Sequence, residues 1–359
     1  MSAFINFDFY GAGNIGDDLM LAGFLSEFKD NIPMSCFIGR DSESQRRRFP
    51  QVAWVEDLPG RAALVNASDC LLGIGDTPFQ TAGNHSMMKK LSADVDAIAG
   101  RDIPFFMIGV GAEAEARTQT DIARKFLWRV DHIWTRDEFT SRILLEDFGY
   151  SPERLSTGSD LANIWLSRAF ANGMLPSSRE IDLGICYYDE HTNGRDIRVL
   201  REFVREYSRD KKVQLFANET RDEKPYERWI YRKIMGAFGS LFRESRTEVF
   251  APDYQNASLP ELVNHFRRYN TVISSRYHAL LTAAWAGCRV VGHGRGSKVN
   301  ALAHELGIPL VENPISVSKL TEAVEHASIV ERKKLEDLWR RAQYAVDELK
   351  TLLNIDYNR

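Results

Sequence analysis

The sequence has few cysteines and no hydrophobic run long enough to cross a bilayer. Its 359 residues include four cysteines. They are widely spaced and form no Cys-x-x-Cys pair, which argues against a disulfide framework or a zinc site. We expect reduced cysteines in the core of a cytoplasmic protein. The longest apolar run, Ile103 to Ala112, is too short for a membrane span, and the first residues lack the regions of a signal peptide.

The sequence also lacks an excess of charge of either sign. It has 46 Lys and Arg against 50 Asp and Glu, a formal charge of -4. Dedicated nucleic-acid binders usually carry a basic excess, so we expect no nucleic-acid partner. The charged runs Arg46–Arg48 and Glu331–Lys334 are typical of a solvated surface, with contact to an anionic membrane as the alternative. Any anionic ligand must therefore be met by a local cluster of cations.

Short apolar runs alternate with amphipathic stretches throughout the chain. About 150 residues per domain predicts two domains. Strands are expected at Phe4–Phe9, Cys70–Ile74 and Phe105–Val110 among others, and helices at 17–28, 138–148, 259–269 and 330–353. This rhythm is typical of a parallel sheet with helices on its faces. We predict an α/β fold of two doubly wound, Rossmann-like domains, 1–174 and 175–359, facing a cleft, the second ending in a long helix.

A glycine-rich loop follows the first predicted strand. The segment Gly11 to Gly16 matches the G-x-G-x-x-G pattern of dinucleotide-binding loops. Asp17 and Asp18 follow it, and carboxylates in the first turn of a helix occupy the positive end that a phosphate would need. Three interpretations stay open: a nicotinamide or flavin site, a tight structural turn, and a polar loop facing a sugar. The last is favoured, because Asn14 and Asp17 can accept hydrogen bonds from hydroxyl groups.

The most informative segment lies in the second predicted domain. An apolar strand ends in Ser274 and Ser275, and Arg276 and His278 follow at the start of an alanine-rich helix. Arginine offers a fork suited to carboxylate or phosphate, and histidine moves protons near neutral pH. The glycine-rich turn after the next strand adds Arg295 and Lys298. Together these residues predict an anion pocket with a proton donor; the alternative is a salt-bridged surface arginine beside a packed histidine.

Several short motifs occur in an order that resembles one known family, the polysaccharide pyruvyl transferases. The segments that carry the resemblance are Gly13-Asn14-Ile15-Gly16-Asp17, Ser68 to Asp76, Phe106 to Gly111, Thr135-Arg136-Asp137 with Ser141, Asp160, Ser275-Arg276-Tyr277-His278-Ala279, and Lys298. They cover most of the chain. Each motif is weak alone, and their order and spacing make the resemblance fairly specific.

The resemblance implies a fold like that of the GT-B glycosyltransferases and an activity. The activity would be transfer of a pyruvyl group from phosphoenolpyruvate to sugar hydroxyls as a ketal, in exopolysaccharide biosynthesis. His278 would be the general acid, and Arg136, Arg276 and Lys298, with Arg295 beside them, would bind the donor. No metal and no cofactor beyond the co-substrate phosphoenolpyruvate is expected.

The first domain is expected to hold the sugar acceptor with polar loops. Carboxylates and amides suit sugar hydroxyls. The candidates are Asn14, Asp17, Asp76, Gln80 and Glu113. A lipid-linked acceptor would bring this cytoplasmic protein to the inner face of the membrane. The alternatives are a GT-B-type glycosyltransferase that uses a nucleotide sugar and a non-catalytic glycan-binding relative.

Overall fold

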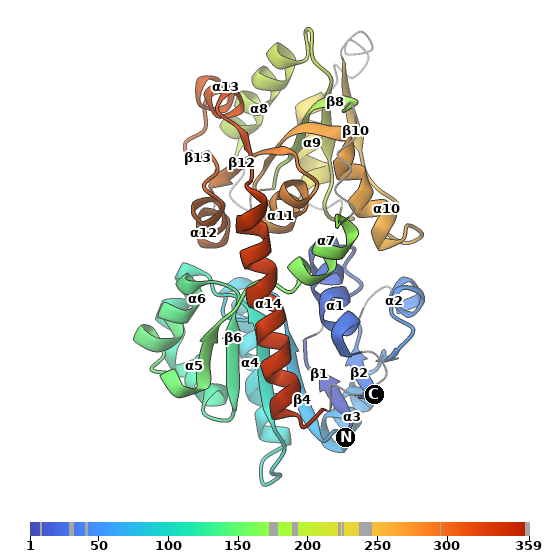
Figure 1. Cartoon of the computed structure of the whole chain (residues 1–359), viewed down its shortest axis with the longest axis vertical. Helices are drawn as coiled ribbons and strands as arrows, with labels where there is room; N and C mark the ends of the chain where they lie inside the picture. Colours follow the sequence, from blue (N-terminus) through green and yellow to red (C-terminus); the bar gives the residue numbers. More distant parts are fainter. Residues whose placement is uncertain are drawn as a thin grey trace. The chain divides into compact units, whose positions relative to one another are not determined.

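The structure is a computed structural model in which the chain divides into two compact units. It describes residues 1–7, 9–28, 32–39, 42–171, 179–188, 193–221, 224, 226–236, 246–294 and 296–355. Unit 1 comprises Met1–Gly11, Asp17–Arg168 and Glu336–Arg359, and unit 2 comprises Ala12–Gly16 and Ala169–Leu335. Each unit is an α/β structure built around one sheet (Figure 1).

Unit 1 contains a parallel sheet with the strand order β3-β2-β1-β4-β5-β6-β7. Its strands are β1 (Ala3–Ile5), β2 (Met34–Phe37), β3 (Val52–Val55), β4 (Cys70–Ile74), β5 (Phe105–Val110), β6 (His132–Thr135) and β7 (Leu155–Thr157). Its helices are α1 (Ile15–Phe28), α2 (Ser42–Arg48), α3 (Leu58–Ala67), α4 (Ala82–Ala97), α5 (Thr120–Leu127), α6 (Glu138–Arg142), α7 (Ala162–Ala169) and α14 (Arg332–Leu352). The first residues of α1 and α14 and the last residue of α7 are assigned to unit 2.

The central strands of unit 1 are apolar along their whole length. Every residue of β4 and β5 is buried, as expected for parallel strands covered by helices on both faces. Phe105, Met107 and Val110 of β5 belong to one apolar cluster with residues of α4 and α5. This explains why continuous apolar runs predict these two strands to the residue.

The long helix α14 completes unit 1 (Figure 1). The indole Nε1 of Trp134 on β6 donates a hydrogen bond of 2.7 Å to Glu348 Oε2 on α14. Glu27 on α1 accepts hydrogen bonds from Gln343, at 2.9 Å, and from Lys350, at 3.3 Å. Polar contacts therefore tie the end of the chain to both a central strand and the first helix of this unit.

Unit 2 contains a second sheet with the parallel order β10-β9-β8-β11-β12-β13, and one short strand, β14, pairs antiparallel with β12. The strands are β8 (Ile181–Cys186), β9 (Val213–Phe216), β10 (Thr247–Phe250), β11 (Tyr269–Ser274), β12 (Arg289–Gly294), β13 (Leu310–Glu312) and β14 (Ser328–Ile329). The helices are α8 (Gly194–Tyr207), α9 (Glu227–Met235), α10 (Leu259–Asn264), α11 (Tyr277–Trp285), α12 (Ser297–Leu306) and α13 (Val317–Glu325).

Local signals fix where several of these helices begin. Asn193 and Ser258 each cap a helix through a capping box, with Asp196 and Glu261 as the third-position acids of α8 and α10. The helix expected over 259–269 is shorter than predicted: α10 ends at Asn264, a 3-10 turn follows, and Tyr269 already belongs to β11. The phenol of Tyr269 donates a hydrogen bond to Gln214 on β9, a tertiary contact that a local pattern cannot reveal.

The two units are not two uninterrupted halves of the chain. The expected boundary between residues 174 and 175 lies outside the described residues. The segment Ala12–Gly16 belongs to unit 2, although it is close to the beginning of the sequence, and residues from Glu336 onward belong to unit 1. The helix predicted over 330–353 exists as α14, with most of its length in unit 1.

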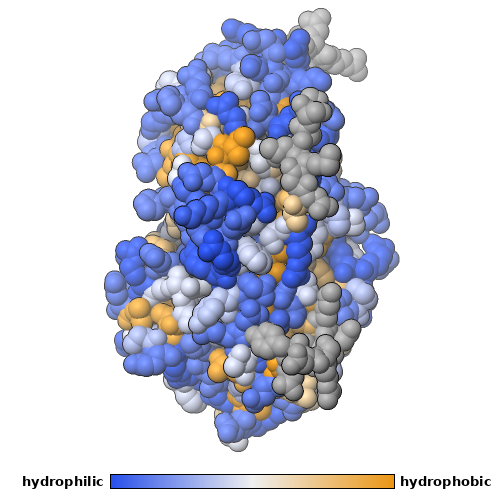
Figure 2. Space-filling view, in the orientation of Figure 1, coloured by the Kyte–Doolittle hydropathy of each residue, from blue (hydrophilic) through white to orange (hydrophobic). Residues whose placement is uncertain are grey.

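The surface in view is mostly hydrophilic, with apolar side chains in small separate groups (Figure 2). Among the described residues, none of the helices is both long and apolar enough to cross a membrane.

We predict that His265 makes unit 2 sensitive to acid. Its ring stacks on Phe250 with 3.7 Å between ring centroids, and Nε2 lies 2.6 Å from Gln214 Oε1. Burial, with a smaller contribution from Arg268, lowers the pKa of His265 from 6.5 to about 4. Because the unfolded chain binds this proton more readily, stability is present above pH 6.5 and is lost as the pH falls toward 4.

Between pH 7 and pH 4.5 we expect the free energy of unfolding to fall by about 2 kcal/mol. This is less than the full pKa shift of His265 would give, because the ring is only part-buried. Urea unfolding of the wild type and of His265→Gln at both pH values measures it. The variant should lose about 2 kcal/mol less than the wild type over this range. An identical pH dependence in the two proteins would show that another group is responsible.

Candidate functional site

The junction between β11 and α11 positions Arg276 and His278. Ser274 Oγ accepts a hydrogen bond of 2.8 Å from Arg276 N and donates one of 3.1 Å to Arg276 O. Ser275 Oγ bonds both backbone polar groups of Tyr188, accepting from N at 2.8 Å and donating to O at 2.7 Å. Arg276 is the N-cap of α11, so His278 lies in the first turn of this helix. The two serines thus fix the junction through backbone groups on both sides of it.

A segment from the beginning of the chain packs against the same unit. We call Ala12–Gly16 the strap; its last two residues begin α1. Asn14 forms an isolated antiparallel bridge with Glu219, just beyond the end of β9. Ile15 N donates to Asn218 O at 3.4 Å, Thr220 N donates to Gly13 O at 3.2 Å, and the amide of Asn218 donates to Asn14 Oδ1 at 3.3 Å. The strap therefore acts as a short extra strand of unit 2.

The strap brings two sequence motifs into direct contact. A Cβ placed on Gly16 would lie 2.0 Å from Nδ1 of His278, so the imidazole occupies the space that any side chain there would need. Gly16 N donates a hydrogen bond of 3.1 Å to Asn14 Oδ1. The Gly13–Asp17 motif and the Ser275–Ala279 motif therefore meet within unit 2. The glycine is required by this close approach.

Arg276 is held between two carboxylates. Its Nε lies 2.6 Å from Glu227 Oε1, and its Nη2 lies 2.7 Å from Glu219 Oε2. The Glu227 side chain is 0% exposed, Glu219 is 4% exposed and Arg276 is 17% exposed. Burial opposes the charge of Arg276, but Glu227 and Glu219 outweigh it and raise the pKa of the guanidinium. Burial raises the pKa of Glu219, despite the arginines beside it.

Aromatic rings and a second arginine close this arrangement into a cycle. The guanidinium of Arg276 lies 3.9 Å from the centroid of the Tyr188 ring, which stacks on Tyr226 with 5.1 Å between centroids. Arg221 lies 4.8 Å from the Tyr226 ring, and its Nε is 2.7 Å from Glu219 Oε1. Each arginine therefore holds one oxygen of Glu219 and covers one ring of the tyrosine pair. We call these five side chains the Glu219 cycle.

A second group of predicted residues lies in unit 1, at the carboxyl ends of β4, β5 and β6. Arg136 is 2% exposed, and its guanidinium bonds Asp137 Oδ2 at 3.3 Å, Thr77 Oγ1 at 3.2 Å and Asp76 O at 3.5 Å. It lies across Gly111, where an added Cβ would be 2.3 Å from Arg136 Cζ. Glycine is needed at this position because the arginine covers it.

One candidate acceptor residue of unit 1, Asp76, contacts Arg136 through its carbonyl. Asp76 has a left-handed φ of 59°, a conformation that costs free energy and is concentrated at functional sites. Its carbonyl accepts from Gly111 N at 2.8 Å, and Glu113 N donates to Phe79 O at 2.9 Å, next to Gln80. These bonds place Asp76, Gln80 and Glu113 on two adjoining loops. Asp17 lies in α1 of the same unit.

Asp17 and Asp76 influence a buried tyrosine. Burial raises the pKa of Tyr10 well above its ordinary value, with additional contributions from Cys36, Asp17, Asp76 and Asp18. Asp18 forms an ion pair of 2.7 Å with Arg48. Asp18 is therefore committed to α2.

The predicted site residues thus fall into two groups. Unit 2 holds Asn14, Arg276, His278 and Lys298, and unit 1 holds Asp17, Asp76, Gln80, Glu113 and Arg136. Asn14 was expected on the first domain with the other acceptor candidates, and the strap places it in unit 2. Lys298 lies in the first turn of α12, beyond the carboxyl end of β12. Arg295 lies outside the described residues.

Other residues of the site were missed by sequence reasoning. Asn218, Glu219, Thr220 and Arg221 directly follow β9, and Tyr188 follows β8 by two residues. Polar residues after a predicted strand of a parallel sheet are a usable signal, because ligands bind at this edge. The described residues contain no group of three or more His, Cys, Asp and Glu side chains that could hold a metal ion.

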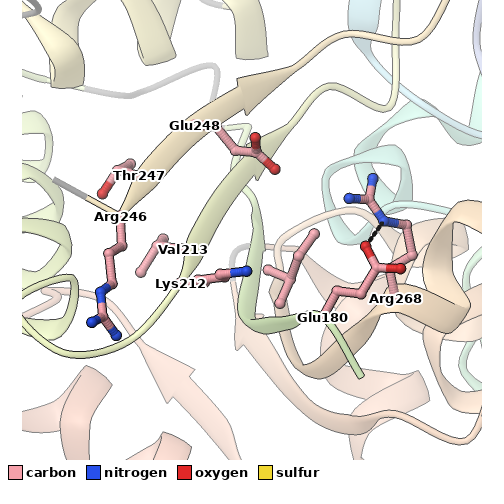
Figure 3. A pocket seen from close by; sticks show the side chains of 8 residues that line it. Glu180, Lys212, Val213, Arg246, Thr247, Glu248 and Arg268 are labelled. Carbon is pink, nitrogen blue, oxygen red and sulfur yellow. Dashed lines mark hydrogen bonds and ion pairs between the residues drawn. The ribbon is translucent and has the colours of Figure 1, made fainter. Parts of the chain in front are cut away.

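A surface pocket of about 590 Å³ lies at the opposite edge of the unit 2 sheet (Figure 3). It is lined by Ile181, Val213 and Thr247, at the amino ends of β8, β9 and β10, and by charged side chains. Arg268 and Glu180 pair across one side of it at 3.0 Å, as Figure 3 shows. The motif residues of unit 2 follow the carboxyl ends of strands, so this pocket is separate from them.

The fold defines the class of protein. The chain is similar to UDP-GlcNAc 2-epimerase from Methanocaldococcus jannaschii, with a TM-score of 0.65 and 12% identity over 98% of this chain and 99% of that chain. It is also similar to UDP-N-acetylglucosamine 2-epimerase from Rickettsia bellii, with a TM-score of 0.64 and 14% identity over 99% of this chain and 96% of that chain. A glycosyltransferase from Rickettsia africae has a TM-score of 0.55 and 12% identity, over 100% of this chain and 99% of that chain. The expected GT-B-like fold of two Rossmann-like units is confirmed.

The sequence defines the family within this class. The family model described as polysaccharide pyruvyl transferase matches residues 14–296, from Asn14 of the strap to Gly296 at the start of α12. The chain therefore belongs to the polysaccharide pyruvyl transferase family, a family of transferases, as its motifs indicate. No curated protein sequence matches the chain.

We predict that Gly16→Ala is harmful although alanine favours helices. Alanine is better than glycine in a helix by about 1 kcal/mol, but its Cβ would overlap the His278 ring. We expect a net loss of about 2 kcal/mol in the free energy of unfolding, measured by urea titration. Gly194→Ala is the matched control, because Gly194 begins α8 and nothing lies within 4 Å of an added Cβ. Equal stability of the two variants would show that Gly16 does not lie in close contact with the His278 ring.

We also predict that Arg276→Lys is costly. A single ammonium group cannot reproduce the fork that bonds Glu219 and Glu227, so one buried carboxylate loses its partner. The expected loss is about 2 kcal/mol, measured by urea unfolding. Arg268→Lys serves as the control, since its ion pair with Glu180 is exposed, and it should change stability by less than about 0.5 kcal/mol. An equal loss of unfolding free energy in the two variants would show that the buried ion pairs of Arg276 contribute no more to stability than the exposed pair of Arg268.

Proposed function

We propose that the protein transfers a pyruvyl group from phosphoenolpyruvate to two hydroxyls of a glycan as a ketal, with His278 as the general acid. Membership of the polysaccharide pyruvyl transferase family supports the transferase class. The observation that carries the specific proposal is the contact of His278 with Gly16, which joins the two most distinctive motifs around a proton-carrying side chain. Histidine is the most common side chain in this role.

The chemistry assigns each proton and bond. His278 donates a proton to the methylene carbon of phosphoenolpyruvate, which generates positive character at C2. A sugar hydroxyl attacks C2, the C2–O bond to phosphate breaks, and a second hydroxyl attacks the same carbon to close the ketal. One hydroxyl proton restores His278 and the other leaves with phosphate. The products are the pyruvylated glycan and inorganic phosphate.

The donor carries a carboxylate and a phosphate, so cations and backbone N–H groups must meet it. We assign this binding to Lys298 and Arg295 near the start of α12, to Arg276 and to Arg136. Arg276 can contribute mainly through Nη1 while its Nε and Nη2 hold the two carboxylates. The positive end of the α11 helix dipole lies at this first turn, beside His278, and favours an anionic ligand there.

The acceptor is proposed to bind through polar side chains. Asp17, Asp76, Gln80 and Glu113 of unit 1 offer oxygens that accept hydrogen bonds from hydroxyls. Asn14 on the strap is the remaining candidate and would contribute through its amide N–H groups, because its Oδ1 already accepts from Gly16 N and from the Asn218 amide. A lipid-linked glycan as acceptor would place the reaction at the inner face of the membrane. No metal ion or further cofactor enters this proposal.

The experiment is incubation of the protein with phosphoenolpyruvate and a panel of glycans, followed by phosphate release and by the mass gain of the glycan. His278→Asn should lower the rate about 100- to 10,000-fold, the usual contribution of a positioned general acid. His304→Asn is the control, because His304 is exposed in the last turn of α12, and it should retain the full rate. A fully active His278→Asn would overturn the general-acid role.

A nucleotide-sugar mechanism is distinguished in the same experiment. Replacing phosphoenolpyruvate by UDP-sugars should give no product and no thermal stabilisation of the protein. Transfer of a sugar from UDP, with no reaction of phosphoenolpyruvate, would replace the proposed function by a glycosyltransferase.

A further inference from the structure

We propose that Glu219 is a positioning residue of the candidate site. It holds the two segments next to His278, the start of α11 and the strap, in one fixed arrangement. This inference rests on the proposed function for its kinetic test, and on the geometry of unit 2 for its structural one. His278 has a neighbour on each side: Arg276 precedes it at the start of α11, and Gly16 of the strap lies against its ring. Glu219 holds both of these neighbours.

The side chain of Glu219 holds Arg276. Its Oε2 lies 2.7 Å from Arg276 Nη2, and Glu219 is 4% exposed, so water competes little for this contact. Arg276 is the N-cap of α11, and His278 follows it by two residues. An ion pair that fixes the Arg276 side chain therefore also restrains the start of the helix that carries His278. Glu227 holds Nε of the same guanidinium at 2.6 Å, so the fork is fixed at two points.

The backbone of Glu219 holds the strap. Asn14 bridges Glu219, and the residues on either side of Glu219 supply the hydrogen bonds: Asn218 O accepts from Ile15 N, and Thr220 N donates to Gly13 O. Gly16 is one residue beyond Ile15. A displacement of the turn after β9 would therefore move the strap against His278, while a displacement of the Glu219 carboxylate would move Arg276.

The Glu219 cycle makes this arrangement rigid. Arg221 holds the second carboxylate oxygen at 2.7 Å, and the two arginines cover the stacked rings of Tyr188 and Tyr226 at 3.9 and 4.8 Å. Two arginines on the two oxygens of one carboxylate, joined through two aromatic rings, restrict the rotation that a single ion pair would leave to Glu219. Each member of the cycle is positioned by two others.

The same groups balance charge beside the proposed acid. Arg221, Glu219, Arg276 and Glu227 form a continuous line of ion pairs with two positive and two negative members. The four side chains therefore form a paired, buried network in which no member is an isolated charge.

The test compares Glu219→Gln with the wild type in the phosphate-release reaction and by NMR of His278. Glutamine keeps the size of the side chain but cannot hold two guanidinium groups through charge. We expect kcat to fall about 10- to 100-fold, because a misoriented acid slows the chemical step. KM for phosphoenolpyruvate should rise by a smaller factor, because Arg276, which is assigned to the donor, loses one of its two carboxylate partners. The His278 Cε1–H resonance, assigned by its loss in His278→Asn, should shift and broaden.

Arg221→Lys provides a second variant that preserves the fold, because its side chain is 27% exposed. It removes the guanidinium that pairs with Glu219 Oε1 and covers the Tyr226 ring, and kcat should fall about 3- to 10-fold with a smaller shift of the His278 resonance. Glu180→Gln is the matched control: it removes a carboxylate from an exposed ion pair of the same unit, and both kcat and the resonance should stay unchanged.

The outcomes separate this inference from the proposed function. Full kcat and an unmoved His278 resonance in both variants would overturn the positioning role, even if their thermal stability falls. If Glu219→Gln does not fold, Arg221→Lys alone decides the question. If the wild type releases no phosphate with any glycan, the proposed function fails, and the NMR comparison still determines whether Glu219 positions His278.

Discussion

The candidate site of unit 2 depends on one buried arginine held between two carboxylates. Removing three charged groups from water is expensive, and only close pairing offsets that cost. Glu219 follows β9, Glu227 begins α9 and Arg276 follows β11, so the pairing joins three elements of the sheet edge. The start of α11 is fixed by this pairing, and His278 follows it within the first turn. The cluster of Arg276, Glu219 and Glu227 therefore has a structural role as well, because it fixes the start of the helix that carries His278.

The strap shows why a glycine motif at one end of the sequence and an arginine-histidine motif near the other belong together. The strap adds a bridge to unit 2 at Asn14, and Gly16 leaves room for the His278 ring. Asn14 accepts hydrogen bonds from Gly16 N and from the amide of Asn218. A glycine motif that resembles a phosphate-binding loop is thus used here for close packing against an imidazole, with its polar side chain bonded inside the turn.

The sequence predicted the parts of the structure that depend on local patterns. Continuous apolar runs predicted β4 and β5, and the serine pair before Arg276 marked the start of α11. Glu219 and Glu227 were not predicted, because acids in a stretch as charged as 219–228 look solvated until their buried partner is known. Asn14 was expected on the first domain, since no local pattern shows that a chain leaves its unit for five residues. Arg136 bonds Asp137 and Thr77 and lies across Gly111, and no local pattern in the sequence shows these contacts.

The discontinuity of the two units has a consequence for synthesis of the chain. The strap is translated long before its partners at Asn218 to Thr220 and at His278. Unit 1 likewise waits for the C-terminal part of α14, whose Glu348 bonds Trp134. All seven strands of the first sheet are therefore translated before α14, the helix that completes unit 1. Unit 1 can make its full set of contacts only after the residues of unit 2 that lie between β7 and α14 have been made.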